Sequence, residues 1–357
     1  MKDEKRKILI TGNEAIAEGA IEAGCRFYAG YPITPQNEIP AYMASHMPQA
    51  GGVFIQAESE LAAINMVFGA SAAGERSMTS SSSPGISLKQ EGISYIAGAR
   101  LPAVIVNIMR GGPGLGNIWP AQSDYFQATR GGGHGDYHCL VLAPASVQEA
   151  YELTGLGFYL ADKYRNPVII LGDGMLGQMM EPLVRKSQKK YKAAFNKVWA
   201  LTGCKGRAPN IVKSLYMRQG DLEKFNLKLQ KHYRLIQSQE ERYEGIFLKD
   251  ARVILVAYGT IARIAKVALH KLRKKGIKIG LIRPITLWPF PKQAFSQKAS
   301  SKTRYLVVEM SYGQMVDDVR LAVGGKREVE FLGRAGGGIP SEEEIIKKVK
   351  KYYEQSI

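Results

Sequence analysis

Short apolar runs alternate with helical patterns along residues 7–181, and this alternation constrains the fold more than any other feature of the chain. The runs LPAVIVNIM (101–109) and NPVIILGDG (166–174) are apolar at successive positions, which is typical of strands buried on both faces. Helical patterns lie between such runs, for example at 59–74 and 146–164. This order predicts a parallel sheet with helices on both faces.

The first strand of this region is predicted at residues 7–12. We expect the following helix to begin with Asn13 as its N-cap and to end at Gly24, because Asn favours helix starts and Gly favours helix ends. Other strands of the same sheet are predicted at 26–32, 51–57, 77–83 and 139–144.

Residues 251–357 repeat the order of strand and helix and predict a second, smaller domain. The amphipathic helix at 261–276 ends in basic residues, as the helix dipole favours, and the last helix, at 341–355, is expected to use Ser341 as its N-cap. The fold class is therefore α/β, with two doubly wound parallel-sheet domains. Strands of the second domain are predicted at 251–260, 277–291 and 304–311.

Residues 183–249 interrupt this order and are strongly basic. The stretch from Leu183 to Asp250 holds 16 Lys and Arg against 6 Asp and Glu, so much of the formal net charge of +17 is concentrated there. We therefore expect three parts: residues 1–182, a basic helical connector at 183–249, and residues 250–357. Apolar residues at helical spacing predict that the connector helix lies on another part of the protein: Leu222, Phe225, Leu229, Tyr233 and Ile236.

The positive charge raises the possibility of nucleic-acid binding. Its distribution argues against that reading, because the surplus lies in one segment and alternates with Leu, Tyr and Phe at helical spacing. A solvated helical face or a protein interface explains the pattern better.

Composition excludes several classes of protein. No apolar run is long enough to span a membrane, and MKDEKRKILITG lacks the apolar core and cleavage site of a signal peptide, which predicts a cytoplasmic protein. The cysteines Cys25, Cys139 and Cys204 are widely spaced, and the five histidines are not expected to form a pair on a helix. We therefore expect neither an iron–sulfur cluster nor a metal site within this chain.

Polar residues follow several strands of the first domain, where open parallel sheets bind ligands. The turn YPITP at 31–35 presents Thr34 between two prolines that restrict the backbone. Arg110 begins a Gly-rich loop after a buried strand, which suits either a bound carboxylate or phosphate or an ion pair across the loop. The run SSSSPG at 80–85 is either an anion site near a helix start or a polar turn.

Glu58 and Glu60 open a helix that is otherwise nearly uncharged. Acidic residues in a first helical turn can simply favour the helix dipole. A carboxylate at the start of a buried helix is poorly solvated, however, which makes it a candidate for proton transfer.

Two other motifs give weaker signals. GDG at 172–174, followed by Asn196, has the ingredients of a diphosphate and Mg²⁺ motif, but Asn196 lies in a basic stretch that we expect to be helical. GGGHGD at 131–136 could bring His134 and Asp136 to a site, although a glycine-rich surface turn fits better. No metal ligand is assigned from these motifs.

Several segments together resemble the alpha subunit of 2-oxoacid:ferredoxin oxidoreductases, and in particular the type that acts on 3-methyl-2-oxobutanoate (2-ketoisovalerate). The segments from the first domain are GYPITPQNEIP (30–40), QAESEL through GLGN (56–117), PAQSDYFQATRGGGHGD (120–136), ASVQEAYEL (145–153) and KYRNPVIILGDGMLGQMMEP (163–182). RVILVAYGTIARIAKVAL (252–269) and LIRPITLWPFP (281–291) resemble the second domain of that subunit, which is similar to a transketolase C-terminal domain.

The resemblance implies that the cofactor site and the electron carriers are divided among several subunits. This chain would supply the pyrimidine-binding-type domain of a thiamine diphosphate site, and a beta subunit would hold the diphosphate and Mg²⁺. Iron–sulfur clusters would lie in partner subunits, which include a gamma subunit and a ferredoxin-like delta subunit, and ferredoxin would take the electrons. Coenzyme A would accept the acyl group left by oxidative decarboxylation of the 2-oxoacid.

The resemblance also implies roles for particular residues. Glu60, rather than Glu58, matches the catalytic glutamate that contacts the aminopyrimidine of the cofactor and promotes deprotonation of its thiazolium carbon. Thr34 and Arg110 match the positions that bind the carboxylate of the substrate. Further cofactor contacts are implied for Tyr31, Pro32, Ser83 and Gly85, and the same pocket is expected to include Asn117, Gln122 and Asp124.

The sequence leaves the substrate open between a branched-chain 2-oxoacid, 2-oxoglutarate and pyruvate. 2-Oxoglutarate would need a cationic group for its distal carboxylate, and the sequence does not indicate which Arg or Lys would supply it. A distant alternative is a non-catalytic basic scaffold or a nucleic-acid-associated protein.

Overall fold

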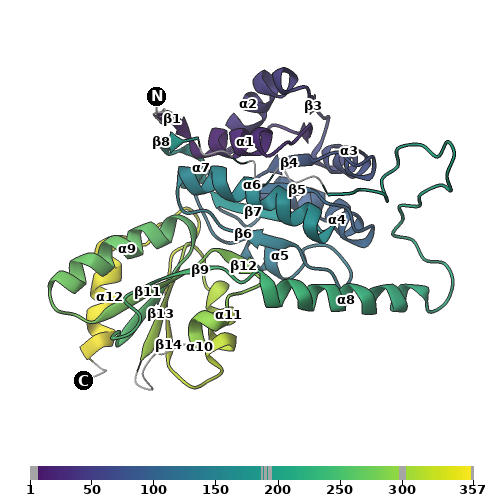
Figure 1. Ribbon diagram of the computed structural model, residues 1–357. Coiled ribbons are helices and arrows are strands. Elements are labelled where there is room, and N and C mark those ends of the chain that lie inside the picture. The colour runs from purple at the N-terminus through teal and green to yellow at the C-terminus, as the bar shows by residue number, and fades with distance from the viewer. Residues whose placement is uncertain (1–6, 186–187, 189–190, 192–194, 297–302, 355–357) are drawn as a thin grey trace, which may run out of the picture.

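The computed structural model describes residues 7–185, 188, 191, 195–296 and 303–354. In these residues two mainly parallel sheets lie side by side, each covered by helices (Figure 1), which confirms the α/β fold class. The strands are β1 (Lys7–Thr11), β2 (Phe27–Gly30), β3 (Val53–Gln56), β4 (Ser77–Ser81), β5 (Val104–Met109), β6 (Leu140–Leu142), β7 (Val168–Asp173), β8 (Met180–Val184), β9 (Tyr243–Ile246), β10 (Val253–Val256), β11 (Ile279–Pro284), β12 (Thr286–Trp288), β13 (Arg304–Glu309) and β14 (Val329–Gly333).

The helices connect and cover these strands. Among the described residues, no helix is both long and apolar enough to cross a membrane. The helices are α1 (Gly12–Glu22), α2 (Glu38–His46), the 3₁₀ turn η1 (Pro48–Ala50), α3 (Glu60–Ala72), α4 (Ser83–Gly98), α5 (Tyr125–Thr129), α6 (Val147–Tyr164), α7 (Gly174–Gln178), α8 (Asp221–Gln239), α9 (Gly259–Lys274), α10 (Gln293–Ser296), α11 (Met315–Val323) and α12 (Glu342–Glu354).

The first sheet has seven strands in the order β12-β6-β7-β5-β4-β2-β3. All neighbouring pairs are parallel except β12 with β6. Every residue of β5 and β7 is buried, as their continuous apolar sequence predicts for strands covered on both faces. On this sheet α1 packs along α6 and α3 packs along α4.

The second sheet has five strands in the order β14-β13-β10-β11-β9, in which only β9 is antiparallel to its neighbour. Each sheet includes an edge strand that lies outside the domain predicted for that sheet. β12 follows β11 directly but pairs with β6 of the first sheet, whereas β9 precedes the second sheet and pairs with β11. The stretch 277–291, predicted as one strand and a Pro-rich turn, is thus two strands in two different sheets.

The start of the chain differs from the prediction in two respects. β1 does not join the main sheet but pairs with β8 in a separate antiparallel pair. The expectation that Asn13 caps α1 is wrong, because Thr11 is the N-cap and forms a capping box with Glu14. Asn13 is buried and its side-chain amide donates instead to the Pro35 carbonyl oxygen (2.8 Å) and to Glu38 (2.7 Å).

The larger hydrophobic core runs continuously from the first sheet to one face of the second. β10 shows this division, because its alternate residues point to opposite faces. Ile254 and Val256 belong to the larger core, whereas Val253 and Leu255 pack with α9 and α12 in a smaller one. Ser341 caps α12 as predicted, because its hydroxyl accepts a hydrogen bond from the Glu344 backbone N–H (3.2 Å). In return, the Glu344 carboxylate accepts from the Ser341 backbone N–H.

The connector helix α8 lies against the first domain (Figure 1). Leu229, Tyr233 and Ile236 are buried in the larger core, while Leu222 is 48% exposed. Residues 195–220 precede α8 as a long loop without regular secondary structure. Asn196 lies exposed in this loop, so the expectation that it sits in a helix is wrong.

Candidate functional site

The YPITP turn follows the carboxyl end of β2 and is held by buried polar groups. Gln36 is fully buried, and its side-chain oxygen accepts a hydrogen bond from Ser80, which is also bonded to Tyr28. The Gln36 side-chain amide donates to the Tyr31 carbonyl oxygen (3.4 Å), and its backbone N–H donates to Ile33 (3.1 Å). The turn is therefore tied to β4, while Tyr31 and Pro32 stay exposed at the surface.

Arg110 follows β5 and is 7% exposed. Its guanidinium donates to the carbonyl oxygens of Thr34 (3.0 Å) and Leu115 (3.1 Å), and its Nε is buried without a partner among the described residues. The alternative of an ion pair across the loop is not what forms, because both acceptors are backbone carbonyls. The structure thus places Thr34 against Arg110 and leaves guanidinium N–H groups for an anion.

The first turn of α4 lies next to Arg110. Ser83 donates to the carboxylate of Asp124 (2.6 Å) and accepts from the Arg110 backbone N–H (3.0 Å). Asn107 also donates to Asp124 (2.9 Å). Burial raises the pKa of Asp124, and these two hydrogen bonds act in the opposite direction. Ser83 and Asp124 therefore fix the backbone that carries Arg110.

Glu60 is the first residue of α3, whose N-cap is Ser59. Its side chain is buried, whereas that of Glu58 is exposed, which favours Glu60 as the functional acid of the pair. Among the described residues, no group donates a hydrogen bond to the Glu60 carboxylate. Such an unsatisfied acid is costly unless a ligand completes its hydrogen bonds.

Gly85 lies directly opposite the Glu60 carboxylate. A Cβ at this position would lie 2.5 Å from Glu60 Oε1 and would also overlap Ser81 Oγ, so any side chain here would clash with both groups. The hydroxyls of Ser81 and Ser82, at the end of β4, are buried without partners among the described residues. α4 therefore presents Ser83 to Arg110 and Gly85 to Glu60 within a single turn.

A cavity of about 470 Å³ opens beside Thr34. Its lining is mainly apolar and combines the YPITP turn, the loop before α5, α7 and one residue of the second domain. Glu38 is its one charged residue, and no Lys or Arg is among the described residues that line it. The lining residues are Thr34, Pro35, Asn37, Glu38, Ile118, Trp119, Pro120, Gly174, Met175, Gln178 and Ile339.

Two residues expected to line the pocket are used elsewhere. Gln122 is fully buried and exchanges hydrogen bonds with the backbone of Met310 (2.8 and 3.0 Å), while its amide donates to the Tyr258 carbonyl (3.0 Å). Asn117 donates to the Gly336 carbonyl (3.0 Å). Both tie the loop after Arg110 to the second domain, and neither is among the residues that line the cavity beside Thr34.

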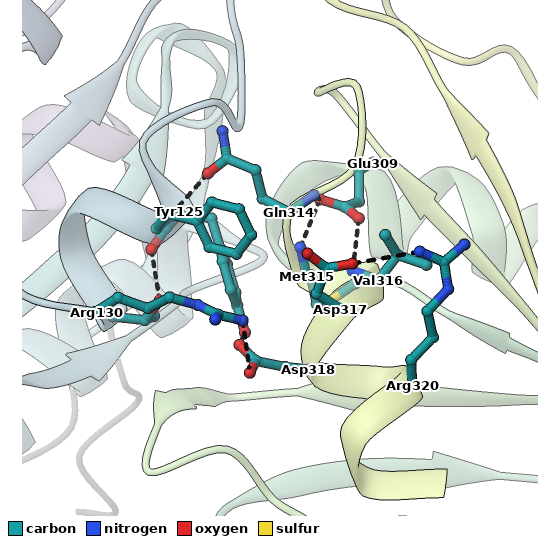
Figure 2. A network of polar contacts seen from close by, with 11 residues as sticks. Tyr125, Arg130, Glu309, Gln314, Met315, Val316, Asp317, Asp318 and Arg320 are labelled. Atoms are coloured by element: carbon teal, nitrogen blue, oxygen red, sulfur yellow. Dashed lines mark hydrogen bonds and ion pairs between the residues drawn. The ribbon is translucent and has the colours of Figure 1, made fainter. Parts of the chain in front are cut away.

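Neighbouring residues extend this contact between the domains (Figure 2). Tyr125 donates to Asp318 (2.7 Å), and Arg130 pairs with the same carboxylate (3.1 Å). Gln314 accepts from the Phe126 backbone N–H (2.8 Å). The second domain thereby fixes the segment that follows the Arg110 loop.

The weaker motifs have structural roles. Asp173 of the GDG motif caps α7 through the backbone N–H groups of Met175 and Leu176, and it accepts from Thr260 (2.9 Å). His134 and Asp136 lie exposed in a surface loop, as the preferred interpretation of GGGHGD predicted. Among the described residues, no group of three or more His, Cys, Asp and Glu side chains could hold a metal ion.

One residue near the site was not identified from the sequence. Lys89 of α4 is fully buried, and its Nζ donates to the backbone carbonyl oxygen of Glu60 (3.1 Å). A signal was present, since Lys89 is the only basic residue between Arg76 and Arg100 and stands in a stretch rich in Gly, Ser and Ile.

Comparisons with known proteins agree with this geometry. The profile described as pyruvate flavodoxin/ferredoxin oxidoreductase, thiamine diphosphate-binding, matches residues 18–229, and that of pyruvate:ferredoxin oxidoreductase core domain II matches residues 251–345. Ketoisovalerate oxidoreductase subunit VorB of Methanothermobacter marburgensis is 50% identical over 96% of this chain and 97% of its own length. 2-Oxoglutarate synthase subunit KorA of Methanothermobacter thermautotrophicus is 38% identical over 96% of this chain and 98% of its own.

A solved structure gives the same result. The 2-oxoglutarate:ferredoxin oxidoreductase from Magnetococcus marinus, with 2-oxoglutarate, coenzyme A and succinyl-CoA bound, superimposes with a TM-score of 0.88 at 28% identity. The match covers 99% of this chain and 66% of that one. The resemblance to a thiamine-diphosphate pyrimidine-type domain followed by a transketolase C-terminal-like domain is thus confirmed, and the chain belongs to the 2-oxoacid:ferredoxin oxidoreductase family as one of its enzyme subunits.

Proposed function

We propose that this chain is the alpha subunit of an oxidoreductase that converts 3-methyl-2-oxobutanoate to an acyl-CoA and CO₂. The observation that carries the proposal is the mostly buried carboxylate of Glu60, which receives no hydrogen bond from a described residue and packs against Gly85. A carboxylate without protein donors is available to a ligand that can donate a hydrogen bond to it. A cofactor nitrogen would satisfy it.

The residues around Glu60 fit the pyrimidine end of thiamine diphosphate. Glu60 would hydrogen-bond the ring, Gly85 would leave room for the Glu60 carboxylate, and Ser83 would keep the first turn of α4 in place. Tyr31 and Pro32 would contact the cofactor from the exposed side of the turn, next to the beta subunit. When bound, this cofactor supplies a nucleophilic carbon and stabilises the negative charge left when CO₂ departs.

Thr34 and Arg110 would bind the carboxylate that all 2-oxoacids share. Arg110 is already oriented by the Thr34 and Leu115 carbonyl oxygens, so little side-chain freedom is lost when an anion binds. The Thr34 side chain is exposed, and its hydroxyl oxygen is 3.5 Å from the Asn37 amide, too long for a strong bond. The hydroxyl therefore stays available as a donor.

The cavity beside Thr34 favours a substrate with an apolar side chain. Its one charged lining residue, Glu38, would repel the distal carboxylate of 2-oxoglutarate, and the lining offers no cation to neutralise that group. 2-Oxoglutarate stays the second candidate because the KorA relative and the Magnetococcus marinus enzyme carry that substrate in their names. Pyruvate is the third.

The remaining parts of the reaction would come from partners. A beta subunit would hold the diphosphate and Mg²⁺, and partner subunits, including a gamma subunit and a ferredoxin-like delta subunit, would carry iron–sulfur clusters. Oxidation of the decarboxylated substrate releases electron pairs, which ferredoxin accepts singly, while the coenzyme A thiol takes the acyl group. We place this complex in the cytoplasm, which fractionation of cells would test.

The test is to purify the chain with its partners and to measure reduction of ferredoxin or a viologen dye. We expect activity that depends on coenzyme A and thiamine diphosphate, with kcat/KM highest for 3-methyl-2-oxobutanoate among branched-chain 2-oxoacids, 2-oxoglutarate, pyruvate and aryl pyruvates. The chain alone should be inactive. A preference for 2-oxoglutarate would overturn the substrate assignment. Steep salt-dependent binding to nucleic acid, without any 2-oxoacid activity, would overturn the enzyme and favour the basic scaffold.

A further inference from the structure

Lys89 lies in the packed interface between α3 and α4. Gly85, Lys89 and Gly92 share one face of α4 because of their spacing. A Cβ on Gly85 would lie 2.5 Å from Glu60 Oε1, and one on Gly92 would lie 2.5 Å from Ile64 Cγ2. Lys89 stands between these contacts, fully buried, with its Nζ 3.1 Å from the Glu60 carbonyl oxygen.

The charge of Lys89 is poorly satisfied by the rest of the fold. Its ammonium forms this single hydrogen bond among the described residues, although it has further N–H groups to donate. Burial lowers the pKa of Lys89 to about 8, and the nearby charge of Glu60 acts in the opposite direction. A buried cation with so few partners destabilises folding, which points to a role outside stability.

The surroundings leave Glu60 as the group on which Lys89 can act. α3 and β5 pack against α4, and Glu60 is the one charged residue of α3, while β5 has no titratable side chain. The loop with His134 and Asp136 contacts α4 through Gln90 and Ser94, which lie on other faces of the helix than Lys89. Both loop side chains are exposed, so solvent screens their charges.

We propose that Lys89 is a positioning residue that places a positive charge behind Glu60 and so orients its buried carboxylate to bond the pyrimidine of thiamine diphosphate. The proposal rests on the proposed function. The hydrogen bond to the Glu60 carbonyl would also hold the first turn of α3 against α4.

Three variants separate charge from packing. Lys89→Met keeps the length and removes the charge, Lys89→Gln keeps a donor for the Glu60 carbonyl without charge, and Lys89→Arg keeps the charge. Each is made in the assembled complex and compared with Glu60→Gln and with the double variant Lys89→Met, Glu60→Gln. The readout is the affinity for thiamine diphosphate, measured by calorimetry on cofactor-depleted complex.

For Lys89→Met we expect cofactor affinity about tenfold weaker at neutral pH, the usual effect of losing a close opposite charge. Lys89→Gln should behave in the same way, and Lys89→Arg should restore most of the affinity. In the Glu60→Gln background, Lys89→Met should change the affinity by less than about twofold, because the carboxylate on which Lys89 acts is absent.

The proposal is overturned if Lys89→Met and Lys89→Gln bind the cofactor as tightly as the wild type. It is also overturned if Lys89→Met weakens binding equally with and without Glu60, since that result indicates packing alone. Thermal unfolding of each complex identifies a variant that fails to fold, in which case Lys89→Gln decides. If the wild-type complex binds no thiamine diphosphate, the proposed function fails first, and this inference falls with it.

Discussion

Glu60 and Glu309 are both buried glutamates at the carboxyl edge of a parallel sheet, one in each domain, yet the hydrogen bonds that their carboxylates receive differ. Glu309 ends β13 and accepts hydrogen bonds from the backbone N–H groups of Gln314 (3.2 Å), Met315 (3.0 Å) and Val316 (2.9 Å), as Figure 2 shows. Ser311 donates to it as well (2.9 Å). In contrast, no described group donates to the Glu60 carboxylate.

This difference distinguishes structural acids from acids reserved for a ligand. Glu309 caps the start of α11 and gives that domain stability, and its hydrogen bonds leave no room for a substrate. Glu60 has the same chemistry and similar burial but lacks these donors. A buried acid with unmet hydrogen bonds is therefore a better indicator of function than burial alone.

Glu60→Gln should give the largest effect and tests the ligand side of the comparison. We expect kcat of the assembled complex to fall by about 10²- to 10⁴-fold, because a group that moves protons is replaced by one that cannot. Thermal unfolding should be nearly unchanged, since no hydrogen bond to the carboxylate is lost. A Gln variant with wild-type turnover would remove Glu60 from the reaction.

Arg110→Lys should give the next largest effect. A lysine cannot contact the Thr34 and Leu115 carbonyl oxygens and also present a planar guanidinium edge to a carboxylate. We expect kcat/KM to fall by roughly 10- to 100-fold, which corresponds to the loss of a charge-assisted hydrogen bond. Arg130→Lys is the matched control, because Arg130 pairs with Asp318 near the surface and should tolerate the change. Equal losses in both variants would contradict the proposed binding of the substrate carboxylate by Arg110.

Glu309→Gln tests the structural side. Its amide nitrogen would face backbone N–H donors that now bond a carboxylate, so we expect unfolding in denaturant to cost about 1–3 kcal/mol less. Turnover per folded complex should stay close to that of the wild type. If the variant were stable but inactive, Glu309 would belong to the site and the contrast with Glu60 would fail.

The pH dependence of stability provides a smaller effect at the same residue. Burial raises the pKa of Glu309, partly opposed by the N–H groups that bond it. The folded state therefore holds this proton more tightly than the unfolded state, and Glu309 makes the protein less stable as pH rises from the ordinary carboxyl range through the raised pKa. Unfolding measured across this range should show a weaker decrease in Glu309→Gln than in the wild type.

Thr34→Val should give a modest effect. Loss of the hydroxyl removes one neutral hydrogen bond to the substrate carboxylate, so kcat/KM should fall by about three- to tenfold. Cofactor affinity should not change, in contrast to Glu60→Gln. Steady-state kinetics with the preferred 2-oxoacid check this, and an unchanged kcat/KM would leave the YPITP turn with a purely structural role.

The sequence predicted the architecture, because strands and helices depend on local patterns. Continuous apolar runs identified β5 and β7. Strand-end positions made Thr34, Glu60 and Arg110 candidates for the site, and their roles stay predictions. The capping box of Thr11 and Glu14 was also readable, since Thr and Glu stand three positions apart, yet Asn13 was preferred as the cap. That error was one of interpretation.

Other features depend on long-range contacts and have no local signal. The family resemblance implied that Gln122 lines the pocket, but its hydrogen-bond partners Tyr258 and Met310 lie far along the chain. The three- and four-residue strands β12 and β9 look like ends of longer segments, because their pairing is decided by edges that other strands leave open. The role proposed for Lys89 depends on how α4 packs on α3, which no local sequence pattern indicates.

The places of β12 and β9 at the edges of the two sheets have a practical consequence for dissecting this protein. A fragment that stops before the second domain would lack β12 and would leave β6 as an open edge with unpaired backbone groups. A fragment that starts at the second domain would lose β9 and expose β11 in the same way. Each half expressed alone would expose an unpaired edge strand that can pair with other copies, so it would tend to aggregate. The halves are therefore better produced as one chain or as complementary fragments mixed during refolding.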